Sequence, residues 1–104
     1  MIIVNTHEIH NKNITETLGI ARGSTVRARN VGQDIFAGLK NIIGGEISEY
    51  TKLQAQSREQ ALQRMTEDAE RMGANAIVNV RLTTSMVMQG CSEILAYGTA
   101  VVVE

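Results

Sequence analysis

The sequence predicts a two-layer α+β domain in which a mainly antiparallel sheet packs on two helices. Three observations lead to this class. Apolar or alternating runs open and close the chain, as is typical of strands. Apolar residues recur at helical spacing in its middle, and glycine and asparagine separate the segments because proline is absent. With 104 residues and no internal repeat, the chain is expected to form a single domain over residues 1–104.

The first third of the chain is expected to supply strands. Ile2 to Asn5 is a short apolar run, and the polar, asparagine-rich stretch from His7 to Asn13 is typical of a loop. One or two strands are expected between Thr17 and Asn30. Alternation would place on their inner face Leu18, Ile20, Val26 and Ala28, and on the other face Thr25, Arg27 and Arg29.

Two helices are expected next. Asp34 to Ile43 carries one apolar stripe at helical spacing, and Gly44 with Gly45 suits its end and a sharp turn. The second helix would run back alongside the first as far as Met72, with Gly73 as its C-cap. A capping-box pattern that starts at Ser57 leaves a break there open.

Two further strands are expected to close the chain. Residues 76–85 alternate, and residues 86–92 form a connection to a final strand, Ile94 to Val103. The alternation would place on one face Ala76, Val78, Val80 and Leu82, and on the other Ile77, Asn79, Arg81 and Thr83.

The final strand is apolar on both of its faces. Leu95, Val101 and Val103 would lie on one side, and Ile94 and Val102 on the other. Full burial of each such aliphatic side chain is worth about 1.5–3 kcal/mol. A chain of this length has little helix to spare for a second layer, so we expect a second copy of the chain to cover one face. Glycine inside this strand is expected to mark a close approach of another segment.

Composition excludes several classes of partner. The formal net charge is −1 and the isoelectric point is about 6.1, so no basic field favours nucleic acid or anionic membranes. The single cysteine fits a reducing compartment. We expect a cytoplasmic protein, because the N-terminus does not resemble a secretory signal and no apolar run approaches the roughly 20 residues that span a bilayer.

Signals for catalysis and metal binding are sparse. His7 and His10 fall in the expected loop and the chain has no Gly-x-Ser-x-Gly elbow, so we expect no enzyme activity. These two histidines and Cys91 are the candidate ligands for a divalent or soft metal ion. Because the chain lacks a CxxC pair, two solvated histidines and a structural thiol are favoured. Arg22, Arg27, Arg29 and Arg81 fall on strand-like segments, where they could hold an anion or pair with glutamates across a subunit interface, and we favour the interface.

Three segments together suggest a family. They are Gly44-Gly45-Glu46 followed by Tyr50, the stretch from Gly73-Ala74-Asn75-Ala76 to Arg81, and Glu93 to Val101. With this pattern the chain resembles, from about Ile3 to Val103, the YbjQ-like family of small bacterial and archaeal proteins labelled as heavy-metal-binding. The resemblance implies a dodecin-subunit-like fold, a closed homo-oligomeric ring with a pentamer favoured, and no established enzyme activity. The residues that it carries over as a structural set are Gly44, Gly45, Glu46, Tyr50, Gly73, Asn75, Glu93, Tyr97, Gly98 and Thr99.

The sequence therefore favours a non-enzymatic, ring-forming homo-oligomer that holds an ion or small ligand at its subunit interfaces. One alternative is a heavy-metal-binding protein that uses histidine and cysteine ligands, and another is an enzyme of unknown reaction. The ligand and the subunit number stay open. The candidate interface or ligand residues are Arg27, Arg29, Glu46, Tyr50, Arg81, Glu93, Tyr97, Gly98 and Thr99.

Overall fold

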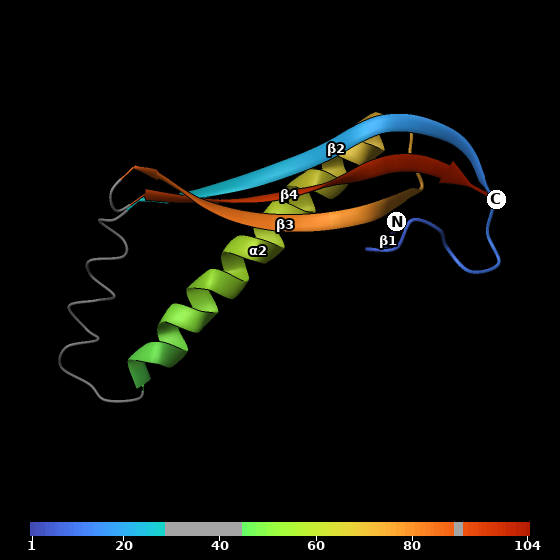
Figure 1. Ribbon diagram of the computed structural model, residues 1–104. Coiled ribbons are helices and arrows are strands. Elements are labelled where there is room, and N and C mark those ends of the chain that lie inside the picture. The colour runs from blue at the N-terminus through green and yellow to red at the C-terminus, as the bar shows by residue number, and fades with distance from the viewer. Residues whose placement is uncertain (29–44, 89–90) are drawn as a thin grey trace.

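A four-stranded mixed sheet carries one long helix on one of its faces in the computed structural model, which describes residues 1–28, 45–88 and 91–104 (Figure 1). The elements are β1 (Ile2–Ile3), β2 (Ile14–Ala28), α2 (Gly45–Arg71), β3 (Ala76–Met88) and β4 (Cys91–Val103). The sheet order is β1-β3-β4-β2. Among the described strands only the short β1–β3 pair is parallel, so the expected α+β class and mainly antiparallel sheet are confirmed.

Several expected boundaries change. The expected helix over residues 34–43, its glycine turn at Gly44, and Arg29 lie outside the described residues. Helix α2 runs without interruption from Gly45 to Arg71, so the capping-box pattern at Ser57 does not break it. Strands β3 and β4 extend into the connection expected over residues 86–92: β3 ends at Met88 and β4 begins at Cys91.

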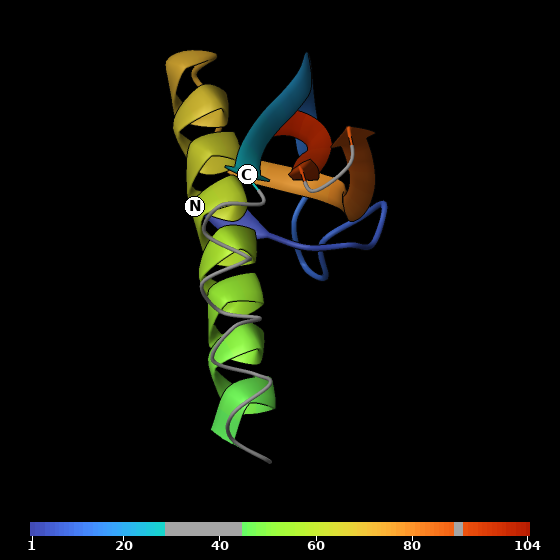
Figure 2. The same ribbon diagram turned by 90° about the vertical axis from the view of Figure 1, so that its left-hand side faces the viewer.

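Helix α2 packs mainly on β2 and β4 (Figure 2). Its contact seam is Ala61, Met65 and Ala69, one residue per turn, and all three are fully buried. Figure 1 shows that the N-terminal half of the helix continues beyond the sheet. The buried residues between this seam and the sheet are Ala21, Ile77, Ile94, Ala96 and Ala100.

The contact between α2 and β2 is unusually close. A Cβ atom added to Gly23 would lie 2.2 Å from the backbone nitrogen of Met65 and 2.5 Å from the carbonyl oxygen of Ala61. Real Cβ atoms essentially never approach backbone atoms to that distance. The absence of a side chain at Gly23 therefore lets the helix backbone rest directly on the strand.

Because helix and strand are so close, the residues of β2 that face α2 around Gly23 are not the ones expected. The side that faces α2 carries the small residues Ala21 and Gly23 with Thr25, which is 3% exposed. Ile20 and Val26, expected inside, are 69% and 54% exposed on the opposite face. The assignment was wrong for Ile20 and Val26, because a strand this close to a helix backbone accepts only small side chains, whereas Leu18 packs against the main core as expected.

A β-bulge also reverses part of the expected alternation in β3. Val78 pairs with Thr99, but the next pair along the ladder joins Arg81 to Tyr97, so the β3 register shifts by one residue at Asn79. Asn79 has a φ of 55°, in the left-handed region that asparagine tolerates. Val80 therefore packs toward the α2 side, where it joins the partly buried residues around the main core. The expected faces hold up to Val78 and are wrong beyond it.

The second face of β4 is covered in part by the chain itself. Val101 and Val103 are buried there in a second cluster with Ala76 and Val78, against which Val4 and Ile9 of the N-terminal segment pack. At the C-terminal end of β4 the chain itself therefore covers this face, so the expected second copy is needed only for the rest of it. Tyr97, nearer the middle of the strand, is still 38% exposed.

Candidate functional site

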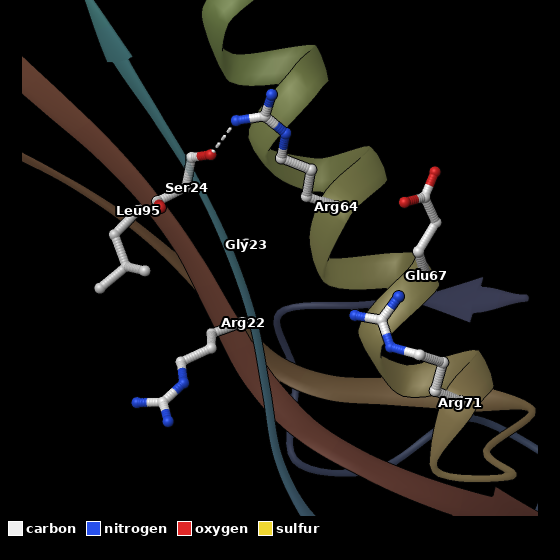
Figure 3. Close-up of a pocket in the computed structure, with 7 residues that line it drawn as sticks. All are labelled: Arg22, Gly23, Ser24, Arg64, Glu67, Arg71 and Leu95. Atoms are coloured by element: carbon white, nitrogen blue, oxygen red, sulfur yellow. Dashed lines mark hydrogen bonds between the residues drawn. The ribbon is translucent and has the colours of Figure 1, made fainter.

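A polar groove runs along the outer edge of β2, where α2 crosses the strand (Figure 3). Its volume is about 460 Å³. Because β2 is the last strand of the sheet, some of its backbone groups face this groove instead of a neighbouring strand. The residues that line it are Arg22, Gly23, Ser24, Arg64, Glu67, Arg71 and Leu95.

Side chains of α2 bind the backbone of β2 inside this groove. Nη1 of Arg64 donates a hydrogen bond to the carbonyl oxygen of Ser24 at 2.6 Å. The backbone N–H of Arg22 donates to Oδ2 of Asp68 at 3.0 Å, and Asp68 Oδ1 accepts from Nη2 of Arg71 at 3.3 Å. These contacts fix the helix side chains against the strand edge.

The cationic side chains surround the strand edge from two sides. Figure 3 shows Arg64 and Arg71 reaching from α2 toward β2, while Arg22 projects from the other side of the strand. The carboxylate of Glu67 is directed away from the strand, and it accepts a hydrogen bond from Nε2 of Gln63 at 3.4 Å. On the α2 side of the strand the groove thus presents the guanidinium groups of Arg64 and Arg71, with its lining carboxylate turned outward, while the Arg22 side chain lies across the strand.

Exposed side chains gather on the face of the sheet opposite α2. We call this the β2–β4 patch, and it comprises Ile20, Arg22, Val26 and Tyr97. Its members share a face because Arg22 pairs with Tyr97, and Ile20 and Val26 lie two and four residues from Arg22 along β2. The Arg22 guanidinium makes no hydrogen bond or ion pair with another described residue.

A different apolar surface lies on the α2 side of the sheet, at the edge that the helix does not reach. We call it the β1–β3 patch, and it comprises Ile3, Val80 and Leu82. Ile3 is 41% exposed and Leu82 is 46% exposed. The three residues of this patch border a shallow groove of about 530 Å³, which is also lined by Val4, Asn5 and Thr6.

The sequence-predicted interface residues do not gather in one place. Arg81 and Tyr97 lie in one cross-strand row with Arg22, and Nη1 of Arg81 donates to the carbonyl oxygen of Asn5 at 2.9 Å. In the sheet register Thr99 pairs with Ile20 and Val78, and Glu93 pairs with Val26 and Ser85. Arg27 pairs with Ser92 near the far end of the same two strands. Glu46 and Tyr50 belong to the first turns of α2, and Arg29 lies outside the described residues.

Gly98 lies inside the subunit. An added Cβ would meet Cγ2 of Ile77 at 2.7 Å and the carbonyl oxygen of Val78 at 2.9 Å. The close approach expected at this glycine is therefore made within one chain, between β4 and β3.

The candidate metal ligands are far apart within one chain. His7 and His10 belong to the loop before β2, whose Ile9 packs near the C-terminal end of β4. Cys91 is the first residue of that strand, whose 13 residues span about 40 Å. His7 instead forms an exposed pair with Glu8, with 2.9 Å between Nε2 and Oε1. Across residues 1–28, 45–88 and 91–104, no group of three or more His, Cys, Asp or Glu side chains could hold a metal ion.

The Gly-Ala-Asn-Ala segment has a structural role. Gly73 adopts a φ of 89° after the end of α2, and Ala74 N–H donates to the carbonyl oxygen of Ala69 at 3.1 Å. The amide side chain of Asn75 then binds both backbone groups of Val103, donating to its oxygen at 2.9 Å and accepting from its N–H at 2.8 Å. The segment joins the helix end to the last residues of β4.

Sequence reasoning did not single out Arg64 and Arg71 as site residues. They are seven residues apart, so two helical turns place them on the same side of α2, and this spacing was a readable signal. Nothing in the sequence, however, indicates which strand edge this side of the helix would meet.

The fold and the groove define a small α+β domain with an arginine-lined strand edge and no helix, in the parts described, long and apolar enough to cross a membrane. The family model described as "Putative heavy-metal-binding" matches residues 1–104, and the chain belongs to this YbjQ family.

Similar proteins carry names that leave their role open. A UPF0145 protein of Methanosarcina acetivorans is 59% identical over 101 residues, covering 97% of this chain and 95% of the relative. A UPF0145 protein of Hahella chejuensis is 55% identical over the full length of both chains.

A solved structure supports the fold. It is the crystal structure of a protein of unknown function of the DUF74 family from Pediococcus pentosaceus, with a TM-score of 0.64 at 14% identity. The match covers 100% of this chain and 98% of that one.

Proposed function

We propose that the protein is a non-enzymatic, ring-forming homo-oligomer, with a pentamer favoured, that holds an ion or small ligand where its subunits meet. The observation that supports the ring is the presence of two unlike apolar patches on opposite faces of the sheet. In a ring, the β2–β4 patch of one subunit packs against the β1–β3 patch of the next.

The composition of the β2–β4 patch suits an interface. Tyrosine and arginine are enriched at the centres of protein interfaces, and here one of each lies beside two aliphatic side chains. Ile20 is 69% exposed, and its full burial would be worth about 1.5–3 kcal/mol. Leaving such residues in water in every subunit would forgo much of that stabilisation.

Two unlike patches favour head-to-tail packing. A twofold dimer buries the same patch on both partners and would leave the other one exposed. Head-to-tail packing buries both patches in every subunit, and it ends without free surfaces when the rotation closes into a ring. The groove at the edge of β2 adjoins the β2–β4 patch through Arg22, so a ligand in it would lie beside the subunit boundary.

Two variants, each of which adds a charge to one of the two patches, test this arrangement. We expect native mass spectrometry to show a closed ring, favoured as a pentamer, for the parent chain, and monomers for Ile20→Glu and for Leu82→Glu. Mixing these two variants should give heterodimers, because each one retains the patch that the other has lost. Gln56→Glu, which adds a charge on the exposed side of α2, is the control and should keep the ring.

Two outcomes would overturn the proposal. A parent chain that is monomeric at micromolar concentration removes the ring altogether. Assembly that is lost in only one of the two variants, with no heterodimer on mixing, indicates a twofold interface instead.

Metal binding is the second candidate, and the description of the family favours it. Because the two histidines and the cysteine are far apart in one chain, a site that uses all three would have to combine ligands from different subunits. The proposed ring would bring ligands of neighbouring subunits together. Zinc titration of a variant that lacks both histidines and the cysteine tests for this shared site.

A further inference from the structure

We propose that the groove between α2 and the edge of β2 binds the phosphate group of a small phosphorylated molecule. Every group that this proposal uses belongs to one chain, so it goes beyond the proposed assembly and does not depend on it. Three features support it: an outward-facing backbone N–H, two anchored guanidinium groups, and a space larger than an oxyanion alone needs.

The backbone donor is the N–H of Ser24. In an antiparallel ladder, alternate residues of an edge strand direct both of their backbone groups away from the sheet. The N–H of Arg22 and the carbonyl of Ser24 bind side chains of α2, so these two residues are the outward-facing ones. The N–H of Ser24 therefore also faces outward into the groove that this residue lines.

Two guanidinium groups stand beside this donor. Arg64 is held against the strand by its 2.6 Å hydrogen bond to the carbonyl oxygen of Ser24, which uses one of its five N–H donors and orients the rest. Arg71 is paired with Asp68, and its side chain is 69% exposed, so it stays accessible to a ligand. Arginine is the residue best suited to phosphate, because its planar fork can donate two parallel hydrogen bonds.

The same contacts argue against an added β-strand as the occupant. A new antiparallel strand pairs with both the N–H and the C=O of an outward-facing residue. Arg22 has its N–H occupied by Asp68, and Ser24 has its C=O occupied by Arg64. What stays available is mainly a set of donors, which matches an oxyanion better than a peptide backbone.

The charge and size of the groove define the ligand further. Arg22, Arg64 and Arg71 oppose the carboxylates of Glu67 and Asp68, so the surroundings are cationic in a chain whose net charge is −1. The volume of about 460 Å³ lies in the range of small-molecule sites. The apolar side chain of Leu95 also lines the groove. We therefore assign the phosphate to the arginine side and the organic part to the wall that includes Leu95.

Calorimetric titration of the full chain at low ionic strength tests the proposal, with inorganic phosphate, ribose 5-phosphate and ribose as probes. We expect saturable binding of both phosphates, tighter for ribose 5-phosphate, and no binding of ribose. Arg71→Gln should weaken phosphate binding about 10-fold or more, since a hydrogen bond to a charged group is worth about 1.5–3 kcal/mol. The matched control is Arg58→Gln, which removes an exposed cation of the same helix outside the groove and should change binding less than about twofold.

An independent readout addresses the backbone donor. The amide resonance of Ser24 should shift on titration with inorganic phosphate in the parent chain and should shift less in Arg71→Gln. Absence of saturable phosphate binding, or equal losses in Arg71→Gln and Arg58→Gln, would overturn the proposal. Binding of inorganic phosphate that equals or exceeds that of ribose 5-phosphate would refute the assignment of an organic part to the groove. Since oligomeric state is measured separately by mass spectrometry, failure of the ring and failure of this site are distinguishable.

Discussion

One added methyl group at Gly23 is expected to destabilise the subunit by about 3–5 kcal/mol. The new Cβ in Gly23→Ala would lie 2.2 Å from the Met65 nitrogen and 2.6 Å from Cβ of Arg64, whereas carbon atoms in favourable contact are about 3.5–4.0 Å apart. Because backbone atoms form part of this contact, a change of rotamer cannot relieve it, and α2 must move away from β2 by about 1 Å.

The magnitude follows from two contributions. Overpacking of a well-packed contact costs about 1–3 kcal/mol. A gap of about 0.5–1 Å along the seam of Ala61, Met65 and Ala69 also forfeits a quarter to a half of the dispersion energy there. In a domain of about 100 residues, each kcal/mol lowers the Tm by about 4–8 °C, so a fall of at least about 12 °C is expected.

Thermal unfolding followed by circular dichroism measures this effect, at equal protein concentrations because assembly would make the Tm depend on concentration. The control is Gly73→Ala. Gly73 has a φ of 89° with nothing within 4 Å of an added Cβ, so this variant carries backbone strain without a clash and should cost about 1–2 kcal/mol. A Gly23→Ala variant that unfolds within about 5 °C of the parent, or no earlier than Gly73→Ala, would refute the reasoning.

The remaining predictions concern other contacts. Gly98→Val should unfold the subunit rather than only dissociate an assembly, because the new side chain meets β3; a folded monomer in circular dichroism and native mass spectrometry would contradict this. Asn75→Ala should cost about 1–3 kcal/mol in denaturant titration and speed amide exchange at Val103, since two hydrogen bonds are lost; unchanged exchange would oppose it. Arg81→Ala should leave the Tm within about 5 °C and raise proteolysis of the N-terminal segment that Arg81 binds through Asn5; equal cleavage in parent and variant would count against that role. Replacing both histidines and the single cysteine should change zinc binding less than about twofold, and a tenfold loss in calorimetry would reveal a site shared between subunits.

The elements themselves were largely readable from the sequence. The helix end at Gly73 and the alternation from Ala76 to Val78 follow from backbone preference and local periodicity, and the structure confirms them. Such signals depend on residues close in sequence, so they can be interpreted without knowledge of the tertiary contacts.

The faces of the strands were less predictable. Hydrophobicity predicts that Ile20 faces the core, but the short distance between β2 and α2 determines which side chains fit on that face. That distance depends on the contact of Gly23 with residues about forty positions further along the chain. The bulge at Asn79 likewise inverts the faces of β3 beyond it, and no residue pattern before the bulge indicates it.

The groove was the least predictable feature. Arg64 and Arg71 are ordinary surface residues of an amphipathic helix until the position of the β2 edge is known. The sequence directed attention to Arg27, Arg29 and Arg81 instead, because these arginines fall on expected strands. In the register, Arg81 shares its row with Arg22 and Tyr97, while Arg27 is paired with Ser92.

The hydrogen bonds from α2 to β2 also bear on aggregation. By occupying the N–H of Arg22 and the C=O of Ser24, Asp68 and Arg64 deny other chains a complete edge on which to add a strand. If α2 detached, it would uncover this edge and the core beneath it in one step. A variant that loosens the helix, such as Gly23→Ala, should therefore aggregate in proportion to the fraction of molecules in which α2 is detached.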